Sequence, residues 1–494
     1  MNLYDVIKTN EITTEYNGTY DISRINIKTI EIDNRKCVEG SLFICIEGYV
    51  TDGHKFAQKA VEAGAVAVVA KNPEALAKYG IALDVPVIYT KDTRKALAAF
   101  SASLYGNPSH KISLVGITGT KGKTTTSYMI RSIYKAAKLD TGLIGTICNK
   151  IGDEEIPTER TTPEANVLQE LLCKMKEREI NTCIMEVSSQ GLHLDRVGFC
   201  KFSTAVFTNL SKDHIGENEH ANMEEYAEAK AKLFSMCGNA LINADSSYSH
   251  IMIDSAKKSG AKIYTYGIDC ESDFKAKNIV KNYNGVEYDI VTAKETYHIK
   301  VPIPGKFSIY NSLCAFACTY IEGISPKYAI EGLENVFVPG KAENVPTGKD
   351  FSVLIDYAHN PDSFENILTT VKEYAKRTVF LFGCGGDRNR PRALMGETAG
   401  KFADFTIITS DNPRSENPES IVKDIEKGII PTGADYICIV DRKQAIEYAI
   451  KNAQPGDVII LAGKGHETEQ IFADRTVHFD EREIVREILR GIEE

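Results

Sequence analysis

The chain has 494 residues, which is too many for a single hydrophobic core and suggests about three domains. Hydrophobic residues make up 43% and charged residues 26%, as in water-soluble globular proteins, and a formal net charge of -10 argues against a nucleic-acid surface. The 12 cysteines form no CxxC pair and no apolar run could span a bilayer, so we expect a cytoplasmic protein with reduced thiols.

Residues 1–108 alternate short strands and helices. The apolar pattern predicts strands over 42–46 and 65–70, with a helix over 55–63. Polar loops at 33–35 and 48–54 are typical of ordinary turns when taken alone. The dipeptide Asn107-Pro108 indicates a linker, so we predict a first small α/β domain over 1–108.

A glycine-rich turn follows the next predicted strand. Gly119, Gly122, Lys123 and Thr124 lie between that strand and a helical pattern, where backbone N–H groups and a helix N-terminus would face an anion. Lys123 would reach the outer phosphates of a nucleotide, and the Thr124 hydroxyl would hold Mg²⁺. The P-loop pattern is imperfect, because its first glycine is replaced by Ile117. We predict a nucleoside-triphosphate site in a central domain over 109–336, with a mostly parallel sheet.

Two further strands of this domain end in polar clusters. The strand over 181–185 leads to Glu186, and the strand over 204–208 leads to the segment containing His214. Ligands bind at the carboxyl edge of such sheets, so both side chains are expected near the phosphates and their metal. A helix over 222–234 carries Lys230 and Lys232, and residue patterns alone do not distinguish them.

A third domain, 337–494, is predicted after the break at Pro339-Gly340. Four apolar strands, at 353–355, 379–382, 406–409 and 458–461, each end in a polar cluster, with helices over 363–374, 420–428 and 442–452. This pattern predicts a doubly wound, Rossmann-like domain. Gly383-Cys-Gly-Gly lacks the third glycine of a dinucleotide site. Arg388 and Arg414 suit a carboxylate, which guanidinium groups bind in a bidentate fork.

Motifs of a recognisable kind occur along essentially the whole chain. They are Asp33-Asn-Arg35, Gly48 with Asp52-Gly-His54, Thr118 to Thr125, Thr161-Thr-Pro-Glu164, Glu186-Val-Ser-Ser189, Asn209 to His214, Asn311, Asp356 to Pro361, and Gly463-Lys-Gly-His-Glu467. In this order, the motifs resemble those of the Mur ligases, ATP-dependent amino-acid ligases of peptidoglycan synthesis. The Asp411-Asn-Pro-Arg414 segment is similar to that of members that add meso-diaminopimelate to UDP-N-acetylmuramoyl-L-alanyl-D-glutamate.

The resemblance implies specific roles for residues of this chain. Lys123, Glu186, His214 and Lys230 would be catalytic, and Thr124, Glu186, His214 and a carbamylated Lys230 would bind Mg²⁺. ATP would contact Gly119, Thr120, Lys121, Gly122, Lys123, Thr124, Thr125, Asn311, Asp356 and His359. The UDP-sugar-peptide would contact Asn34, Thr161, Thr162, Ser188 and Arg196, and the amino acid would contact Arg388, Asp411, Asn412, Arg414, Gly463 and Glu467.

Several alternatives stay open. The loop after Asp213 resembles the L-lysine-adding branch, and Asn34, Arg160 and Leu194 depart from the family pattern, so another acceptor or a lysine-adding paralogue is an alternative. A folylpolyglutamate-type ligase would lack the first domain, and a nucleotide switch would have no use for the carboxylate-binding arginines. We expect a monomer whose partners are the UDP-dipeptide and an amino acid, without nucleic acid or membrane.

Overall fold

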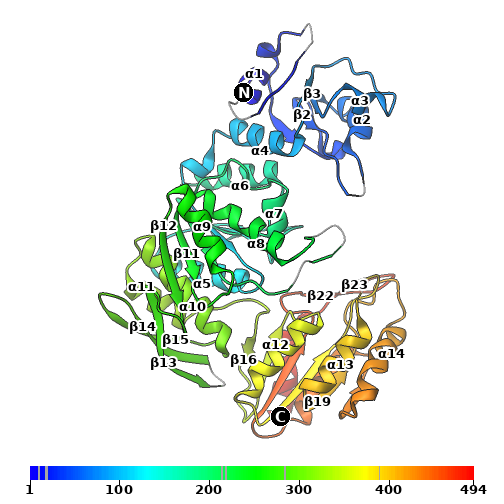
Figure 1. The fold of residues 1–494 in the computed structure, drawn as a ribbon. Coiled ribbons are helices and arrows are strands. Elements are labelled where there is room, and N and C mark those ends of the chain that lie inside the picture. Colours follow the sequence, from blue (N-terminus) through cyan, green and yellow to red (C-terminus); the bar gives the residue numbers. More distant parts are fainter. Residues whose placement is uncertain are drawn as a thin grey trace. The chain divides into compact units, whose positions relative to one another are not determined.

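The computed structural model describes residues 1–8, 12–16, 20–49, 51–212, 215–216, 220–282, 285–388 and 390–493. The chain divides into two compact units, Met1–Lys275 with Leu313–Ala329, and Ala276–Ser312 with Ile330–Glu494. Figure 1 shows the order of the elements. The three-domain boundaries at 108 and 336 stay a prediction, and each unit is described by itself.

The first unit begins with a four-stranded parallel sheet, β1 (Thr29–Glu31), β2 (Ser41–Ile44), β3 (Ala65–Ala70) and β4 (Val87–Tyr89), in that order. Alternate residues of β2 face opposite sides, as the two-residue period of a strand requires. Leu42 and Ile44 pack with α1 (Leu3–Ile7) and α4 (Thr93–Leu104), whereas Phe43 packs with α2 (Ala57–Glu62). The predicted helix over 55–63 begins instead with a 3₁₀ turn over Gly53–Phe56.

A larger, mostly parallel sheet follows in the same unit. Its parallel strands have the order β12 (Lys262–Gly267), β11 (Cys237–Asn243), β10 (Phe202–Phe207), β5 (Ser113–Thr118), β9 (Thr182–Glu186) and β6 (Gly142–Ile144). Beyond β6, the strands β7 (Asn149–Ile151) and β8 (Glu154–Ile156) continue it in antiparallel pairing. The helices α6 (Ala165–Glu177), α8 (Met223–Ala231) and α9 (Ser249–Ser259) bury their apolar residues in one core with these strands. This confirms the mostly parallel sheet and brings the ends of β5, β9 and β10 to one edge.

The second unit contains an antiparallel segment that the sequence reasoning did not predict. The strand β13 (Phe274–Asn282) begins in the first unit and is followed by β14 (Gly285–Val291), which pairs antiparallel with β15 (Thr296–Val301). These strands alternate buried and exposed residues, which is typical of a sheet with one solvated face. No helix lies between these strands along the described chain, although Ser312 of α10 (Lys306–Ile321) contacts the buried Tyr288 of β14, with 2.7 Å between the two hydroxyl oxygens.

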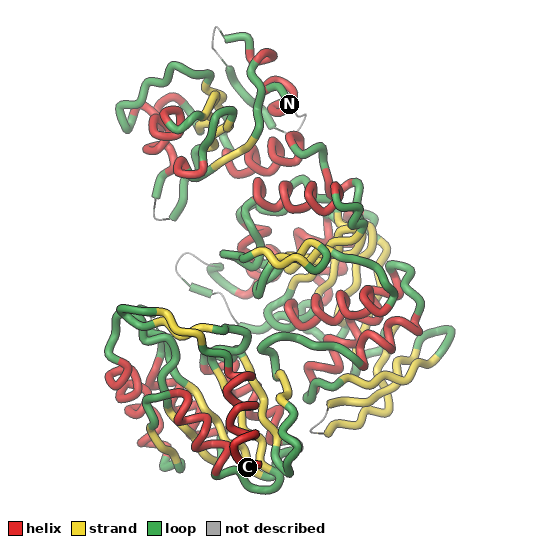
Figure 2. The backbone as a smooth tube through the Cα atoms, turned by 180° about the vertical axis from the view of Figure 1, so that it is seen from behind, coloured by secondary structure: helices red, strands yellow, loops and turns green. Residues whose placement is uncertain are grey.

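The rest of the second unit has six strands in the order β16 (Glu343–Val345), β17 (Ser352–Asp356), β21 (Asp457–Ala462), β18 (Arg377–Phe382), β19 (Phe405–Ile408) and β20 (Tyr436–Cys438). All pair in parallel except β16. The helices α12 (Pro361–Lys372), α13 (Arg392–Phe402) and α14 (Pro418–Ile429) cover one face, and α15 (Arg442–Lys451) and α16 (Glu481–Glu493) cover the other (Figure 2). The predicted doubly wound domain is confirmed.

The helices α13 and α14 make an unusually close backbone contact. A Cβ atom built on Gly428 of α14 would lie 1.7 Å from the carbonyl oxygen of Ala393. Any side chain at this position would push the two backbones apart, so the packing of this layer requires glycine.

Candidate active site

The P-loop is a tight turn between β5 and α5 (Lys123–Ala136). Gly119 has a φ of 150°, and a Cβ atom there would lie 1.9 Å from the hydroxyl oxygen of Thr208. The Lys123 Nζ donates to the carbonyl oxygens of Gly119 at 2.8 Å and Thr120 at 3.1 Å. An ammonium group and a helix N-terminus therefore meet at the loop, which is suited to an anion.

Asn209, just after the end of β10, stabilises the P-loop through hydrogen bonds to its backbone. The Lys121 N–H donates to Asn209 Oδ1 at 3.0 Å, and Asn209 Nδ2 donates to the Lys121 carbonyl oxygen at 3.0 Å. Thr208 Oγ1 also donates to this oxygen at 2.7 Å. The loop is thus held in shape by the neighbouring strand of the sheet.

Glu186 lies at the end of β9, beside the first turn of α5. Thr124 Oγ1 donates to its Oε2 at 2.9 Å, and Thr146 donates to both carboxylate oxygens at 3.0 Å. The predicted proximity of Thr124 and Glu186 is therefore present. His214 lies outside the described residues.

The two candidate lysines of α8 and the turn after it differ sharply. Lys230 is only 1% exposed. Its Nζ donates to the Gly119 carbonyl oxygen at 3.0 Å, and the same Nζ lies 4.4 Å from the ring centroid of Tyr226. Lys232 is exposed. Only Lys230 is beside the P-loop.

A cavity of about 750 Å³ in the first unit is lined by Lys123, Thr146 and most of the predicted acceptor-binding residues. Thr162 is buried, and its hydroxyl donates to the Glu186 carbonyl oxygen at 3.0 Å and accepts from the Ser188 N–H at 3.0 Å. Thr162 thereby attaches the cavity wall to the carboxyl end of β9, where Glu186 also lies. Thr161, Thr162, Ser188 and Arg196 line it, whereas Asn34, in a 3₁₀ turn after β1, does not.

Three guanidinium groups surround one carboxylate in this cavity wall. Arg196 Nε lies 3.1 Å from Glu164 Oε1, Arg94 Nη1 lies 3.5 Å from Oε2, and Arg160 forms a third ion pair with Glu164. Burial lowers the pKa of Arg196, as do the neighbouring Arg160 and Arg94, against the opposing effect of Glu164. The cluster has excess positive charge and faces a cavity, so it can bind an anionic ligand.

The sequence reasoning did not assign Arg94, Arg160 and Glu164 to ligand binding. Arg160 directly precedes Thr161, and this position next to a predicted acceptor contact could have indicated that it binds the ligand. Arg94 is in the first turn of α4, which packs against the four-stranded sheet at the beginning of the chain. Nothing in the sequence around Arg94 indicated that it lines the cavity.

A smaller pocket, about 140 Å³, lies at the carboxyl edge of the second unit's sheet. Arg414 Nη1 donates to the carbonyl oxygens of Gly386 at 3.2 Å and Asn412 at 3.4 Å. Glu416 instead pairs with Arg392 at 2.8 Å, and no carboxylate within the described ranges forms an ion pair with Arg414. The pocket wall contains all six predicted amino-acid contacts, Arg388, Asp411, Asn412, Arg414, Gly463 and Glu467, together with Arg390, His359 and Tyr357.

Below this pocket, Arg442 is fully buried at the start of α15. Its Nη2 donates to the Ala462 carbonyl oxygen at 2.7 Å and its Nη1 to that of Ser410 at 3.3 Å. Its Nε donates to Oε1 of Glu481, the first residue of α16, at 2.8 Å. Arg442 thereby connects the ends of β19 and β21 to the last helix.

The remaining nucleotide candidates also belong to the second unit. Asp356 ends β17 and accepts the N–H groups of Ala342 at 2.8 Å and Ala358 at 2.7 Å. Burial and the nearby cations Arg390 and Lys341 lower the pKa of His359, against the opposing effect of its hydrogen bond to the Tyr357 carbonyl oxygen. Asn311 is buried in α10 (Lys306–Ile321).

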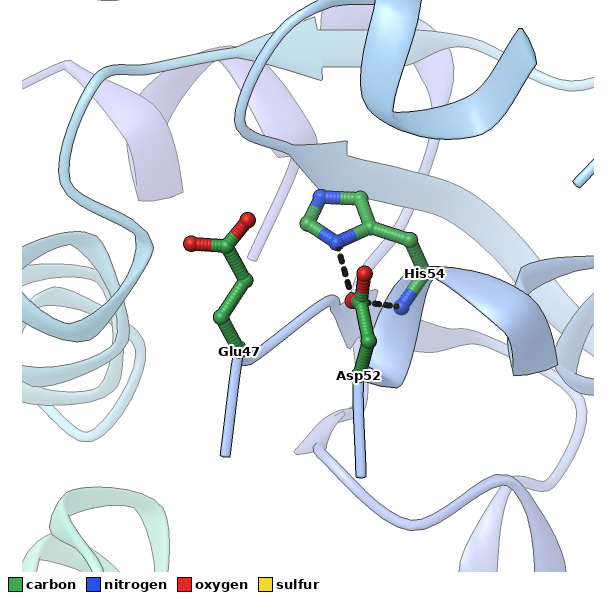
Figure 3. Close-up of side chains that lie close together, drawn as sticks. All are labelled: Glu47, Asp52 and His54. Atoms are coloured by element: carbon green, nitrogen blue, oxygen red, sulfur yellow. Dashed lines mark hydrogen bonds and ion pairs between the residues drawn. The ribbon is translucent and has the colours of Figure 1, made fainter. Parts of the chain in front are cut away.

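Glu47, Asp52 and His54 lie close together in the first sheet layer (Figure 3). Both ring nitrogens of the buried His54 are engaged, because Nδ1 is 2.7 Å from Asp52 Oδ1 and Nε2 accepts the Lys71 N–H at 3.1 Å. Glu47 pairs with the Lys71 Nζ at 2.8 Å. These groups satisfy one another and hold the loop at the end of β3, and the imidazole has no nitrogen left for a metal.

The fold and the loop at β5 define a nucleotide-binding α/β protein of the P-loop class. Three family models match the chain: the Mur ligase catalytic domain over 26–105, the Mur ligase middle domain over 117–319 and the Mur ligase glutamate ligase domain over 342–465. The chain therefore belongs to the Mur ligase family of ATP-dependent, amide-forming ligases, and the resemblance seen in the sequence is confirmed.

Individual relatives match over the full length. The UDP-N-acetylmuramoyl-L-alanyl-D-glutamate–2,6-diaminopimelate ligase of Caldanaerobacter subterraneus subsp. tengcongensis is 46% identical, covering 99% of each chain. The ligase of the same name from Clostridium botulinum is 44% identical, covering 100% of each. A solved structure of a ligase of this name is 28% identical, with a TM-score of 0.74 over 100% of this chain and 99% of the other. Within the described ranges, the protein has no helix with the length and apolar character needed to cross a membrane.

Proposed function

We propose that this protein attaches 2,6-diaminopimelate to the D-glutamyl carboxylate of UDP-N-acetylmuramoyl-L-alanyl-D-glutamate, with ATP as the energy source. The observation that carries this choice of amino acid is Arg414, which lines the small pocket while Glu416 is paired elsewhere. The full-length relatives named for this activity support it.

The phosphate-binding part of the proposal rests on the P-loop. Lys123 and the N–H groups at the start of α5 would bind the outer phosphates of ATP. The hydroxyl of Thr124 and the carboxylate of Glu186 are oxygen donors of the kind that Mg²⁺ prefers, so these residues fit the metal. When bound, Mg²⁺ would neutralise phosphate charge during transfer.

Lys230 is proposed to join this set as a carbamate. As an ammonium it would be repelled by a nearby divalent cation, whereas carbamylation replaces the positive charge with a carboxylate. Its burial and its position at the Gly119 carbonyl oxygen support this assignment. His214 is proposed as a further contributor on the basis of the sequence motif.

The acceptor is proposed to occupy the large cavity. Thr161, Thr162 and Ser188 would orient the peptide, while Arg196 and the guanidinium groups around Glu164 would bind its anionic groups. Transfer of the γ-phosphoryl group to the glutamyl carboxylate would give an acyl phosphate, which an amine can attack with loss of phosphate. This chemistry depends on positioning and charge neutralisation, which these residues are suited to provide.

The incoming amino acid is proposed to bind the small pocket. Its carboxylates would pair with Arg388 and Arg414, and its ammonium groups with Asp411 and Glu467. Lysine lacks the second carboxylate, so it would leave a guanidinium without its anionic partner.

The test is a steady-state assay with ATP, Mg²⁺, the UDP-dipeptide and either meso-diaminopimelate or L-lysine. We expect one ADP and one phosphate per amide bond, and a clear preference for diaminopimelate in kcat/KM. A preference for lysine would contradict the choice of amino acid. ATP turnover that ignores both acceptor and amine would contradict the ligase assignment for this substrate pair.

A further inference from the structure

Lys464 is a fully buried lysine behind the amino-acid pocket, with a side-chain exposure of 0%. Its Nζ donates to Asn412 Oδ1 at 3.0 Å, lies 3.3 Å from Glu467 Oε2, and is 3.8 Å from Asp411 Oδ1. A buried ammonium is stable only when such partners offset its desolvation. One cation therefore connects three residues of the pocket wall.

This contact also fixes the orientation of the Asn412 amide. Its Oδ1 accepts from both Lys464 Nζ and the Ile471 N–H, at 3.0 Å each, so the oxygen must face these donors. The amide nitrogen then points to Glu467 Oε2 and donates to it at 2.9 Å. Lys464 and Asn412 consequently engage the same oxygen of Glu467, which sets the direction of its carboxylate.

Lys464 also changes the charge of the pocket. Among the described residues that line the wall, Arg388, Arg390 and Arg414 are accompanied by two carboxylates, those of Asp411 and Glu467. The ammonium behind those carboxylates offsets part of their negative charge. A positive pocket favours a ligand that carries an additional carboxylate.

We propose that Lys464 is a positioning and specificity-determining residue, which holds Asp411, Asn412 and Glu467 and biases the pocket toward an amino acid with a second carboxylate. The inference rests on the proposed function, since it concerns the choice between diaminopimelate and lysine. Lys464 acts through its neighbours and need not touch the substrate.

The test compares the full-length wild type with Lys464→Met, which keeps the length of the side chain and removes the charge, and with Lys464→Gln, which keeps a hydrogen-bond donor. We expect the ratio of kcat/KM for diaminopimelate to that for lysine to fall by about tenfold in both variants, because a single charge interaction over a few ångströms has an effect of this size. KM values for ATP and the UDP-dipeptide should stay near those of the wild type. Lys443→Met is the matched control, because Lys443 is exposed and pairs with Glu487.

The ratio is measured on one preparation with two amino acids, so a reduced folded fraction cancels from it. An unchanged ratio in either active variant overturns the role of Lys464, even if overall activity falls. A wild type that attaches neither amino acid would instead overturn the proposed function, so the two failures are distinguishable.

Discussion

Arg414 offers a direct test of how the amino acid is chosen. Its side chain is partly buried, and it donates hydrogen bonds to two carbonyl oxygens at 3.2 and 3.4 Å, long contacts that contribute little to folding. Removing one partner of a hydrogen-bonded charge pair costs about 2–5 kcal/mol, and partial exposure favours the lower end, about 2–3 kcal/mol. Arg414→Ala should therefore reduce kcat/KM for diaminopimelate by about 30- to 150-fold.

The same variant should change kcat/KM for lysine by less than about threefold, because lysine has no second carboxylate to lose its partner. Phosphate release measured with each amino acid provides both values. Arg475→Ala serves as the control, since Arg475 is an exposed arginine paired with its neighbour Asp474. Equal losses with the two amino acids would refute the reasoning, because they would indicate a general structural role for Arg414.

Three further predictions concern other parts of the molecule. Lys230→Ala should lose most ligase activity while retaining a cooperative thermal transition, whereas Lys232→Ala should retain activity; the reverse result would assign the wrong lysine. Burial, reinforced by Glu170 and Asp33 against the opposing effect of Lys36, raises the pKa of Glu31 to about 7 from an ordinary 4.5. The Glu31 carboxyl group therefore loses its proton at lower pH in the unfolded chain than in the folded protein. As pH rises from 4.5 to about 7, Glu31 increasingly lowers the free energy of unfolding. Glu31→Gln should raise the free energy of unfolding by about 1–2 kcal/mol at pH 8, allowing for partial exposure, and by almost nothing at pH 4 in urea titrations; an equal gain at both pH values would contradict this. Gly428→Ala should destabilise the second unit by about 1–3 kcal/mol or more, whereas Gly491→Ala in α16, where a Cβ meets nothing within 4 Å, should be neutral or slightly stabilising in the same thermal melts.

The fold was accessible from sequence wherever a local pattern determined the structure. The strand over 65–70 was predicted with its observed bounds, and the P-loop helix follows the glycine turn as expected. The β14–β15 hairpin was missed because the surrounding β-α-β pattern favoured a parallel sheet, although the alternation of its residues carried the signal.

The candidate site was less accessible, because its contacts join distant segments. Residue patterns could not separate Lys230 from Lys232, since burial against Gly119 depends on tertiary packing. Arg94 reaches Glu164 across 70 residues, and Lys464 reaches Asn412 across 52, and neither spacing is visible in a local motif. Sequence identified the polar strand ends, whereas the partners that orient those side chains required the structure.

The Arg442–Glu481 pair has a consequence for how the chain can be shortened. The guanidinium group lies beneath the amino-acid pocket, but its carboxylate partner comes from the first turn of α16. A chain cut before residue 481 would lose that partner while the cation stayed enclosed by the strand ends at Ser410 and Ala462. The amino-acid pocket therefore depends on α16 for its structure. Removing this helix would disturb the loops that hold Asp411 and Gly463.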